Sequence, residues 1–352
     1  MDFQDTAIRI PHSRPTLGPE ERRAVDEVLR SGQVAMGPEV AAFEREMARA
    51  VGVEHAVATG SGTAALAFAL AGLSAGPGTE VIVPAYVCPA VANAVLWAGA
   101  TPVPADVDPE TGCMDMEDAM ARKTDKTRAV VAVHLFGRPV DPAAYKALSV
   151  PVVEDCAQAV GAVVNNRPVG SLSHAAVFSF YATKMLCTGE GGMVLTPDET
   201  VARKARAMRE SDVPPSPEGR YNAKMTDVAA AMGRAQLRKL PGFVEARRRL
   251  AHDFGRAFSG LDAAILPDAP GHVFYRFVLK VPGDADEAVA RIQARGASAE
   301  LPVPEPLHMA LGLPDYPGAR SCRKHFVSIP IYPSLSRRET KAVVKAVKEA
   351  LG

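Results

Sequence analysis

The sequence predicts an α/β fold in which helices cover both faces of a buried sheet, followed by a smaller α+β unit. Apolar stretches of strand length alternate with helical stretches through the first half of the chain. These strand-like stretches are apolar throughout, which is typical of a sheet that is buried on both faces. The last part of the chain carries one further apolar stretch among amphipathic helices, which indicates the second unit.

The first predicted elements are two amphipathic helices, at residues 18–30 and 38–51, the second with a proline near its start. Strands and helices then alternate. The strands are predicted at 55–59, 80–85, 127–136, 150–156, 175–180 and 191–196, and the helices at 62–73 and 90–100. The connection between the last two strands is too short for a helical crossover. They are therefore either antiparallel neighbours or separated strands of a mixed sheet.

A loop rich in proline and charge is predicted at 211–219. It is followed by a helix at 225–240, and a basic helix continues to about residue 256. The remaining elements are a strand-like apolar stretch, a helix and a last helix, at 272–281, about 286–295 and near 336–351. We predict a large α/β domain at 1–245 and a small α+β domain at 246–352.

Composition excludes several classes of function. The 352 residues include 40 basic and 40 acidic side chains, so the neutral chain carries no charge excess typical of nucleic-acid or acidic-membrane binding. The five cysteines are odd in number and lack CxxC spacing, which disfavours a disulfide framework or a zinc site and favours a reducing compartment. The chain shows no signal peptide and no apolar run of transmembrane length. We expect a cytoplasmic protein without a metal.

A glycine-rich turn joins the strand at 55–59 to the next helix. Gly60, Gly62 and Ala65 match a loose dinucleotide-binding pattern, which also requires an acid at the end of the following strand. Glu80 stands at the start of that strand instead, which disfavours a nicotinamide dehydrogenase. The turn remains either a plain tight turn or, with its exposed amides at a helix N-terminus, a binding site for a phosphate.

Lys184 and Asp155 suggest the chemistry. Asp155 ends an apolar strand, where α/β proteins build sites, although an isolated acid there is more often a helix cap. Lys184 lies in the loop between two buried strands. Pyridoxal phosphate (PLP) needs an amine that forms a Schiff base, a carboxylate that keeps the pyridine nitrogen protonated, and a phosphate cradle. Lys184, Asp155 and the turn at Gly62 and Thr63 supply the three, so we predict a PLP enzyme.

The sequence resembles the DegT/DnrJ/EryC1/StrS family of sugar aminotransferases, which are fold-type I PLP enzymes. The resemblance runs over nearly the whole chain and includes SGTAAL (61–66), EDCAQA (154–159), FSFYATK (178–184) and RYNAKM (220–225). It implies a mixed, mostly parallel sheet, a small C-terminal domain and a homodimer with shared active sites. It also implies a ping-pong cycle through pyridoxamine phosphate, with L-glutamate as donor and a nucleotide-linked keto sugar as acceptor.

The resemblance assigns a role to each predicted site residue. Lys184 holds the cofactor and moves a proton between Cα of the donor and C4′ of the cofactor. Asp155 pairs with the ring nitrogen, and Gln158 lies beside the ring. The phosphate is assigned to Gly62, Thr63, Ser179 and, from the neighbouring subunit, Asn222.

The sequence departs from the family pattern at Cys88, where many relatives place an aromatic residue that stacks on the cofactor ring. A thiol gives a thinner contact, and Tyr86 and His134 are candidates to compensate for it. The C-terminal substrate stretch also lacks the family's arginine. A keto-cyclitol or another carbonyl therefore stays open as the acceptor. So does a non-catalytic PLP-binding regulator, which the absence of an attached DNA-binding segment disfavours.

Three other residues have two interpretations each. His134 follows a buried strand, and we favour a hydrogen-bonded core histidine over a group beside the cofactor. Tyr181 precedes the lysine by three residues and is equally consistent with lining the pocket or with ordinary packing. Arg276 has the geometry to bind a substrate phosphate, but a surface strand position is the favoured interpretation.

Overall fold

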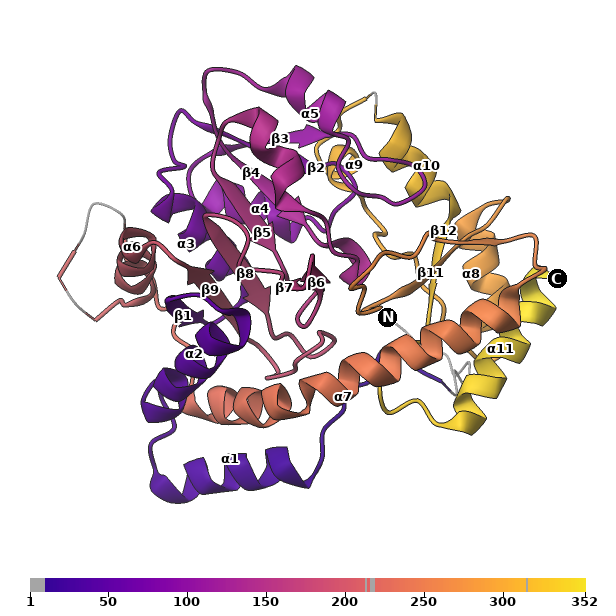
Figure 1. Ribbon diagram of the computed structural model, residues 1–352, viewed down its shortest axis with the longest axis horizontal. Helices are drawn as coiled ribbons and strands as arrows, with labels where there is room; N and C mark the ends of the chain where they lie inside the picture. The colour runs from indigo at the N-terminus through magenta and orange to yellow at the C-terminus, as the bar shows by residue number, and fades with distance from the viewer. Residues whose placement is uncertain (1–9, 213, 216–218, 315) are drawn as a thin grey trace.

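The computed structural model describes residues 10–352 except 213, 216–218 and 315, so part of the loop predicted at 211–219 lies outside the described residues. Figure 1 shows a large sheet, a small C-terminal sheet and a long helix, α7 (Asp227–Phe258), that runs from one to the other. Among the described residues, no helix is long and apolar enough to cross a membrane.

In the described part of the chain, the large sheet has seven strands in the order β1-β9-β8-β5-β4-β2-β3. They are β1 (His55–Thr59), β9 (Gly192–Thr196), β8 (Ala175–Ser179), β5 (Val152–Asp155), β4 (Thr127–Val133), β2 (Glu80–Pro84) and β3 (Thr101–Ala105). Neighbours from β8 to β3 are parallel, whereas β9 is antiparallel to both β1 and β8. The prediction of a mixed, mostly parallel sheet is confirmed, and the two strands around Lys184 are antiparallel neighbours.

Helices cover both faces of this sheet because its strands are apolar on both faces. On β8, Ala175 and Val177 join the core on one side, while Ala176 and Phe178 join the core on the other. The first core is closed by α3 (Gly62–Gly72), α4 (Ala90–Trp97) and α6 (Glu199–Arg209), and the second by α2 (Pro38–Val51) and the first half of α7, against which α1 (Pro19–Ser31) packs.

Short elements connect the strands. They are α5 (Met116–Arg122), the 3₁₀ turns Leu135–Gly137 and Pro142–Leu148, and the hairpin of β6 (Val163–Val164) with β7 (Arg167–Pro168). The turn at Leu135–Gly137 follows β4 at the edge of the sheet where β5 and β8 also end. Phe136 adopts a positive φ of 61° within it.

The C-terminal region has its own core. It contains β10 (Ala264–Ile265), β11 (Phe277–Lys280), β12 (Phe326–Ile329), α8 (Ala285–Gln293), α9 (Leu307–Ala310), α10 (Pro317–His325) and α11 (Arg337–Leu351). Phe254 and Phe258 at the end of α7 pack on Phe277 of the small sheet. Helix α7 passes through residue 245 and contributes side chains to the cores of both sheets, so the boundary placed there stays a prediction.

The strand expected at 272–281 is shorter than expected. Only Phe277–Lys280 joins the small sheet, so the prediction was wrong for residues 272–276. There the chain turns at Phe274, which has a φ of 49°, and pairs with the turn after β4. The Val273 N–H donates to the Gly137 carbonyl at 3.0 Å, and the Arg276 N–H donates to the Phe136 carbonyl at 3.2 Å. This segment thereby reaches the large sheet.

Candidate active site

The N-terminus of α3 meets the end of β8. Ser61 caps the helix, because its Oγ accepts the Ala64 N–H at 3.2 Å. A Cβ on Gly62 would lie 2.8 Å from the Ser179 Cβ, so a glycine is needed where the two elements approach. The first amides of a helix lack intrahelical partners. Those of Gly62 and Thr63, at the start of the helix that approaches Ser179, are therefore suited to bind an anion.

Asp155 stands at the end of β5. Its side chain is nearly buried, and Oδ1 accepts the Ala157 N–H at 2.9 Å. Burial raises the pKa of this carboxyl. The hydrogen bond from the Ala157 N–H and the charge of Lys184 both act to lower the pKa, but burial outweighs them. A cationic partner would stabilise a carboxylate in this position, because water does not fully solvate the buried charge.

Lys184 lies in a compact loop between β8 and β9. The Thr188 N–H donates to the Phe180 carbonyl at 2.8 Å, and the Lys184 N–H donates to the Tyr181 carbonyl at the same distance. The loop is thus closed by backbone hydrogen bonds on both sides of the lysine. Lys184 is half-buried, and its Nζ lies 5.3 Å from the centroid of the Tyr275 ring.

A cavity of about 240 Å³ brings the predicted groups together. Seven of the eight predicted site residues line it, namely Gly62, Thr63, Cys88, Asp155, Gln158, Ser179 and Lys184. The Gln158 side chain is fixed there, since its Oε1 accepts the Phe136 N–H at 2.7 Å. A larger cavity, of about 870 Å³, lies between α7 and residues 265–274 and contains none of the predicted residues.

Asn222 is the eighth predicted residue, and it does not line the cavity of its own chain. Its side chain is exposed. The next residue, Ala223, accepts the Gly60 N–H through its carbonyl at 2.7 Å. This bond holds the Asn222 segment beside the glycine turn while its side chain faces outward.

Cys88 lines the cavity and is exposed, whereas the two residues considered as its substitutes lie elsewhere. Tyr86 is fully buried, with its ring 5.8 Å from that of Phe326, and burial raises its pKa well above the usual value. His134 is also fully buried. Neither residue therefore compensates for the thiol at the cavity. Of the two interpretations of Tyr181, the structure favours the pocket, because this half-exposed side chain lies on the lining.

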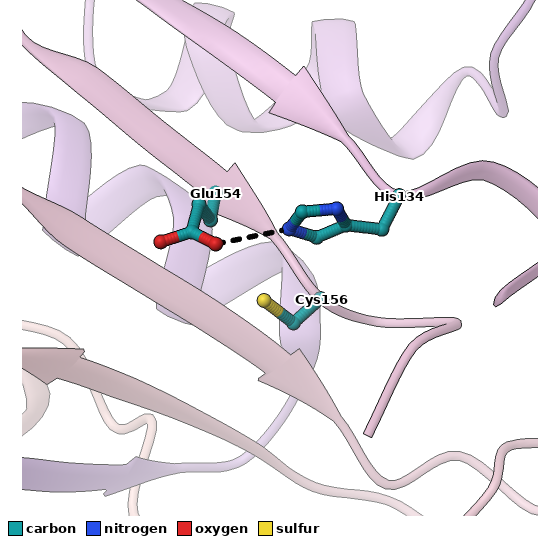
Figure 2. A group of neighbouring side chains, drawn as sticks. All are labelled: His134, Glu154 and Cys156. Atoms are coloured by element: carbon teal, nitrogen blue, oxygen red, sulfur yellow. Dashed lines mark hydrogen bonds and ion pairs between the residues drawn. The ribbon is translucent and has the colours of Figure 1, made fainter. Parts of the chain in front are cut away.

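His134 belongs to a buried cluster with Glu154 and Cys156 (Figure 2). The Val140 N–H donates to its Nδ1 at 3.0 Å, so its proton is on Nε2, which donates to the Glu154 carboxylate at 3.1 Å. This arrangement is the core histidine that the sequence favoured. The same contacts occupy the histidine nitrogens that would bind a metal.

Sequence reasoning missed Glu154, although a buried acid within an apolar strand was a visible signal. Its two oxygens accept hydrogen bonds from His134, from the Gly170 and Leu172 N–H groups, and from the Ser173 hydroxyl, at 2.8 to 3.1 Å. Burial alone would raise the pKa of Glu154, but these hydrogen bonds outweigh burial and lower it. The carboxylate therefore anchors the segment 170–173 to β5.

The other residues missed are Glu190, which is exposed at the cavity, and Tyr275, whose ring faces Lys184. Arg276 does not line the cavity. Its Nη1 lies 3.2 Å from the His12 Nε2 and 3.7 Å from the Glu300 carboxylate, so it joins the N-terminal segment to the small sheet.

The cavity residues fit PLP. Free amides at the start of a helix suit a phosphate, a buried carboxyl with a raised pKa suits a protonated ring nitrogen, and a half-buried lysine supplies the amine. A carboxyl with a raised pKa in a cavity is also a common mark of a functional site.

Comparison with known proteins gives the family. Residues 15–348 match the model of the DegT/DnrJ/EryC1/StrS aminotransferase family. The UDP-N-acetyl-3-dehydro-alpha-D-glucosamine 3-aminotransferase of Acidithiobacillus ferrooxidans is 34% identical and covers 99% of each chain. The dTDP-3-amino-3,4,6-trideoxy-alpha-D-glucose transaminase of Streptomyces venezuelae is 36% identical, covering 95% of this chain and 92% of the relative.

A solved structure agrees with these relatives. The crystal structure of Streptomyces venezuelae DesV in complex with a ketimine intermediate superposes with a TM-score of 0.88, at 35% identity over 94% of each chain. The chain therefore belongs to the DegT/DnrJ/EryC1/StrS aminotransferase family, and it is a PLP-dependent aminotransferase.

Proposed function

We propose that Lys184 holds the cofactor and that the enzyme moves an amino group from L-glutamate to a nucleotide-linked keto sugar. The observation that carries this proposal is the single cavity that Lys184, Asp155 and the start of α3 share. The acceptor class is supported by the two relatives, whose names specify aminotransfer on a UDP-linked and a dTDP-linked sugar. Because their carriers differ, the proposal stops at a nucleoside diphosphate.

Each cavity residue has a task in this reaction. Bound PLP supplies an electron sink that stabilises negative charge on the carbon beside the transferred nitrogen. Asp155 would pair with the ring nitrogen and keep its proton in place, and Lys184 Nζ would carry the proton between Cα of the donor and C4′. Gln158 would lie beside the ring, and because the Phe136 N–H donates to its Oε1, its amide N–H groups are left to donate.

The phosphate is held by the Gly62 and Thr63 amides and the Ser179 hydroxyl in our proposal. We infer that Asn222 completes this group from the second subunit of a homodimer. Two features support this inference: Asn222 is exposed, and its segment is hydrogen-bonded to the glycine turn at Gly60. A side chain that faces outward beside this turn is suited to contact a neighbouring chain.

The first test is the visible spectrum of the purified enzyme before and after L-glutamate is added, for the wild type and for Lys184→Ala. We expect a cofactor band that glutamate converts to that of the pyridoxamine form, and no such conversion in the variant. A wild-type band that ignores glutamate would overturn the donor. Conversion at the wild-type rate in Lys184→Ala would overturn the role of the lysine.

The acceptor is tested by adding UDP- and dTDP-linked keto sugars to the pyridoxamine form of the enzyme. We expect the visible band of the PLP form to return and an amino sugar to appear by mass spectrometry. The same keto sugars without the nucleotide serve as the control and are expected to react far more slowly. Equal rates with and without the nucleotide would overturn the nucleotide-linked acceptor.

Sharing of sites between subunits is tested by mixing two inactive variants, Lys184→Ala and Asn222→Ala. In a mixed dimer, one site combines Lys184 of one chain with Asn222 of the other, so we expect activity to return after the subunits exchange. If Asn222 acted within its own chain, every site would lack one of the two residues. No recovery despite confirmed exchange would therefore overturn the shared site.

We also propose that the enzyme works in the cytoplasm. All five cysteines are free thiols, and three of them, Cys156, Cys187 and Cys322, are buried. Unpaired thiols are usual in reducing compartments. Fractionation of the source cells with an antibody against the chain tests this, and enrichment outside the cytoplasmic fraction would contradict it.

A further inference from the structure

Tyr275 lies against Lys184 although it belongs to the segment that leads into the small sheet. The Lys184 Nζ lies 5.3 Å from the centroid of its ring. The phenol oxygen is 3.3 Å from the Thr183 Oγ1, within hydrogen-bonding distance, and the side chain is 6% exposed. The face of an aromatic ring is negative and attracts an ammonium group within about 6 Å of its centroid.

The backbone of Tyr275 is fixed by the large sheet. A Cβ on Gly137 would lie 2.8 Å from the Tyr275 nitrogen, and Gly137 has a φ of +87°, so a glycine is required at this approach. On the other side, Arg247 of α7 donates from Nη1 to the carbonyls of Tyr275, Phe274 and Ile331 at 3.1, 3.2 and 2.8 Å. Both contacts set the position of the ring.

Arg247 is a buried guanidinium that binds backbone carbonyls. Burial lowers its pKa to about 10. A buried cation is costly unless hydrogen bonds compensate for its burial. Here three carbonyls on two segments accept from Nη1, whereas the buried Nε has no partner among the described residues. The arginine therefore joins the residues before β11 to the residues after β12, and it holds the turn at Phe274.

The ring is also surrounded by positive charge. The Arg276 Cζ lies 5.6 Å from the centroid of the Tyr275 ring, in addition to Lys184. Burial alone would raise the pKa of the Tyr275 phenol, but the neighbouring Lys184 and Arg276 outweigh burial and lower it. The Tyr275 phenol therefore interacts electrostatically with both cations, Lys184 and Arg276.

We propose that Tyr275 is a positioning residue that holds the ammonium group of Lys184 in the cavity whenever the lysine is not joined to the cofactor. This inference rests on the proposed role of Lys184. A lysine side chain has a long flexible stem, and once free it has many conformations outside the reach of the reacting carbon. The ring face attracts the ammonium group without a strong acceptor that would prevent its later movement.

The test uses the full-length enzyme in its PLP and pyridoxamine phosphate forms. Lys184 is labelled with trace acetic anhydride at a series of pH values and quantified by mass spectrometry of its peptide. Because the ring favours the ammonium form, we expect Tyr275→Leu to lower the midpoint of labelling in the pyridoxamine form by about 1 pH unit. Tyr275→Phe keeps the ring and is expected to stay near the wild type.

A kinetic measurement accompanies the labelling. We expect Tyr275→Leu to slow the glutamate half-reaction about tenfold, as follows from a loss near 1.4 kcal/mol, while the KM for glutamate is unchanged. A residue that merely supported the fold would change the amount of active enzyme and leave the midpoint of labelling unchanged. An unchanged midpoint in Tyr275→Leu would therefore overturn the inference.

The same labelling separates this inference from the proposed role of Lys184. If Lys184 holds PLP, it is protected in the PLP form and labelled in the pyridoxamine form. Equal labelling in both forms would overturn the role of the lysine, and with it the inference. Protection in the PLP form together with an unchanged midpoint in Tyr275→Leu would overturn the inference alone.

A second pair of variants applies if Tyr275→Leu does not fold. Phenylalanine and a ring-fluorinated phenylalanine at position 275 have nearly the same shape, but fluorine removes negative charge from the ring face. We expect the fluorinated enzyme to show the lower labelling midpoint. Equal midpoints for this matched pair would contradict a contact between the ring face and the ammonium group.

Discussion

Glu154 and Asp155 are neighbours on β5, and the sheet separates their environments. Both residues are buried, at 0% and 8% exposure, but their side chains point to opposite faces of the sheet because they are consecutive residues of a strand. Glu154 faces His134 (Figure 2) and accepts hydrogen bonds at both oxygens, whereas Asp155 faces the cavity with Lys184. The pKa of Glu154 is lowered, and that of Asp155 is raised.

The difference shows that burial alone does not mark a functional acid. A buried carboxylate whose oxygens are satisfied by protein donors is stable as an anion and serves the fold. A buried carboxylate with unfilled bonding capacity is destabilised as an anion until a cation arrives. Asp155 is in the second condition, which matches the pairing with a protonated ring nitrogen that we propose.

The largest effect is expected for Asp155→Asn. Removing one partner of a buried ion pair costs roughly 3–5 kcal/mol, so the rate of the glutamate half-reaction should fall by about 10² to 5 × 10³-fold. The thermal midpoint of the cofactor-free protein should not fall, because the asparagine replaces a carboxylate that burial disfavours. Stopped-flow absorbance and calorimetry measure the two quantities. A near-wild-type rate would show that Asp155 is not the partner of the ring.

Glu154→Gln should show the opposite behaviour. The glutamine places an amide N–H₂ where two donors now meet an oxygen, so we expect a loss of about 2–4 kcal/mol in the free energy of unfolding. Once folded and loaded with cofactor, the variant should keep most of its rate per active site. Denaturant unfolding with active-site titration measures this. A rate loss as large as that of Asp155→Asn at unchanged stability would contradict the structural role of Glu154.

The pH dependence of stability should separate the two acids by sign. The lowered pKa of Glu154 stabilises the fold above the usual carboxyl range, and this contribution is lost as the pH falls through the lowered pKa. The raised pKa of Asp155 destabilises the cofactor-free fold at neutral pH, and this cost disappears in acid.

At pH 7, Glu154→Gln should therefore have a lower free energy of unfolding than the wild type, and Asp155→Asn a higher one. Both differences should become smaller as the pH falls from about 7 to about 3. Urea unfolding of the cofactor-free proteins at each pH gives both differences, and the wild type at each pH is the control. Two differences of the same sign would contradict the assignment of either pKa.

The two acids also show how much the sequence could predict. Asp155 was found because it ends an apolar strand, and because the glycine turn, the acid and the lysine follow one another along the chain. The close approach of Gly62 to Ser179 brings the glycine turn to the end of the strand that leads into the lysine loop. Glu154 was visible as an acid within an apolar strand, but its partners could not be predicted, because its four donors come from segments that only tertiary packing brings together.

Tyr275 was missed for a related reason. Residues 272–281 have the composition of one apolar strand, and local propensity gives no sign that the first five leave the sheet. Their path depends on Phe274 at positive φ and on the buried Arg247, which are set by contacts between distant segments. The family resemblance does not replace this information, because it predicts the motif residues and not the supports around them.

The smallest effects concern two cysteines, one in the buried cluster with Glu154 and one on the cavity with Asp155. Cys156 is buried beside Glu154, where burial raises its pKa well above the usual value, while Cys88 is exposed on the cavity. Exposure makes Cys88 the thiol that iodoacetamide should modify first, and bound PLP should protect it. Cys156 should remain unmodified in the folded enzyme, and its reaction at a similar rate would contradict the burial of the cluster.

Cys88→Phe should strengthen PLP binding, because an aromatic ring offers a broader contact than a thiol. Aromatic contacts contribute about 0.5–1.5 kcal/mol, so the Kd for PLP should fall by roughly 2- to 10-fold. Fluorescence titration of the cofactor-free enzyme measures it, with Cys88→Ala as the control for loss of the thiol. An unchanged Kd would mean that side-chain contact at position 88 does not limit cofactor affinity. The affinity for PLP would then come from the contacts to its phosphate group and from the pairing with Asp155, which lies on the cavity side of β5.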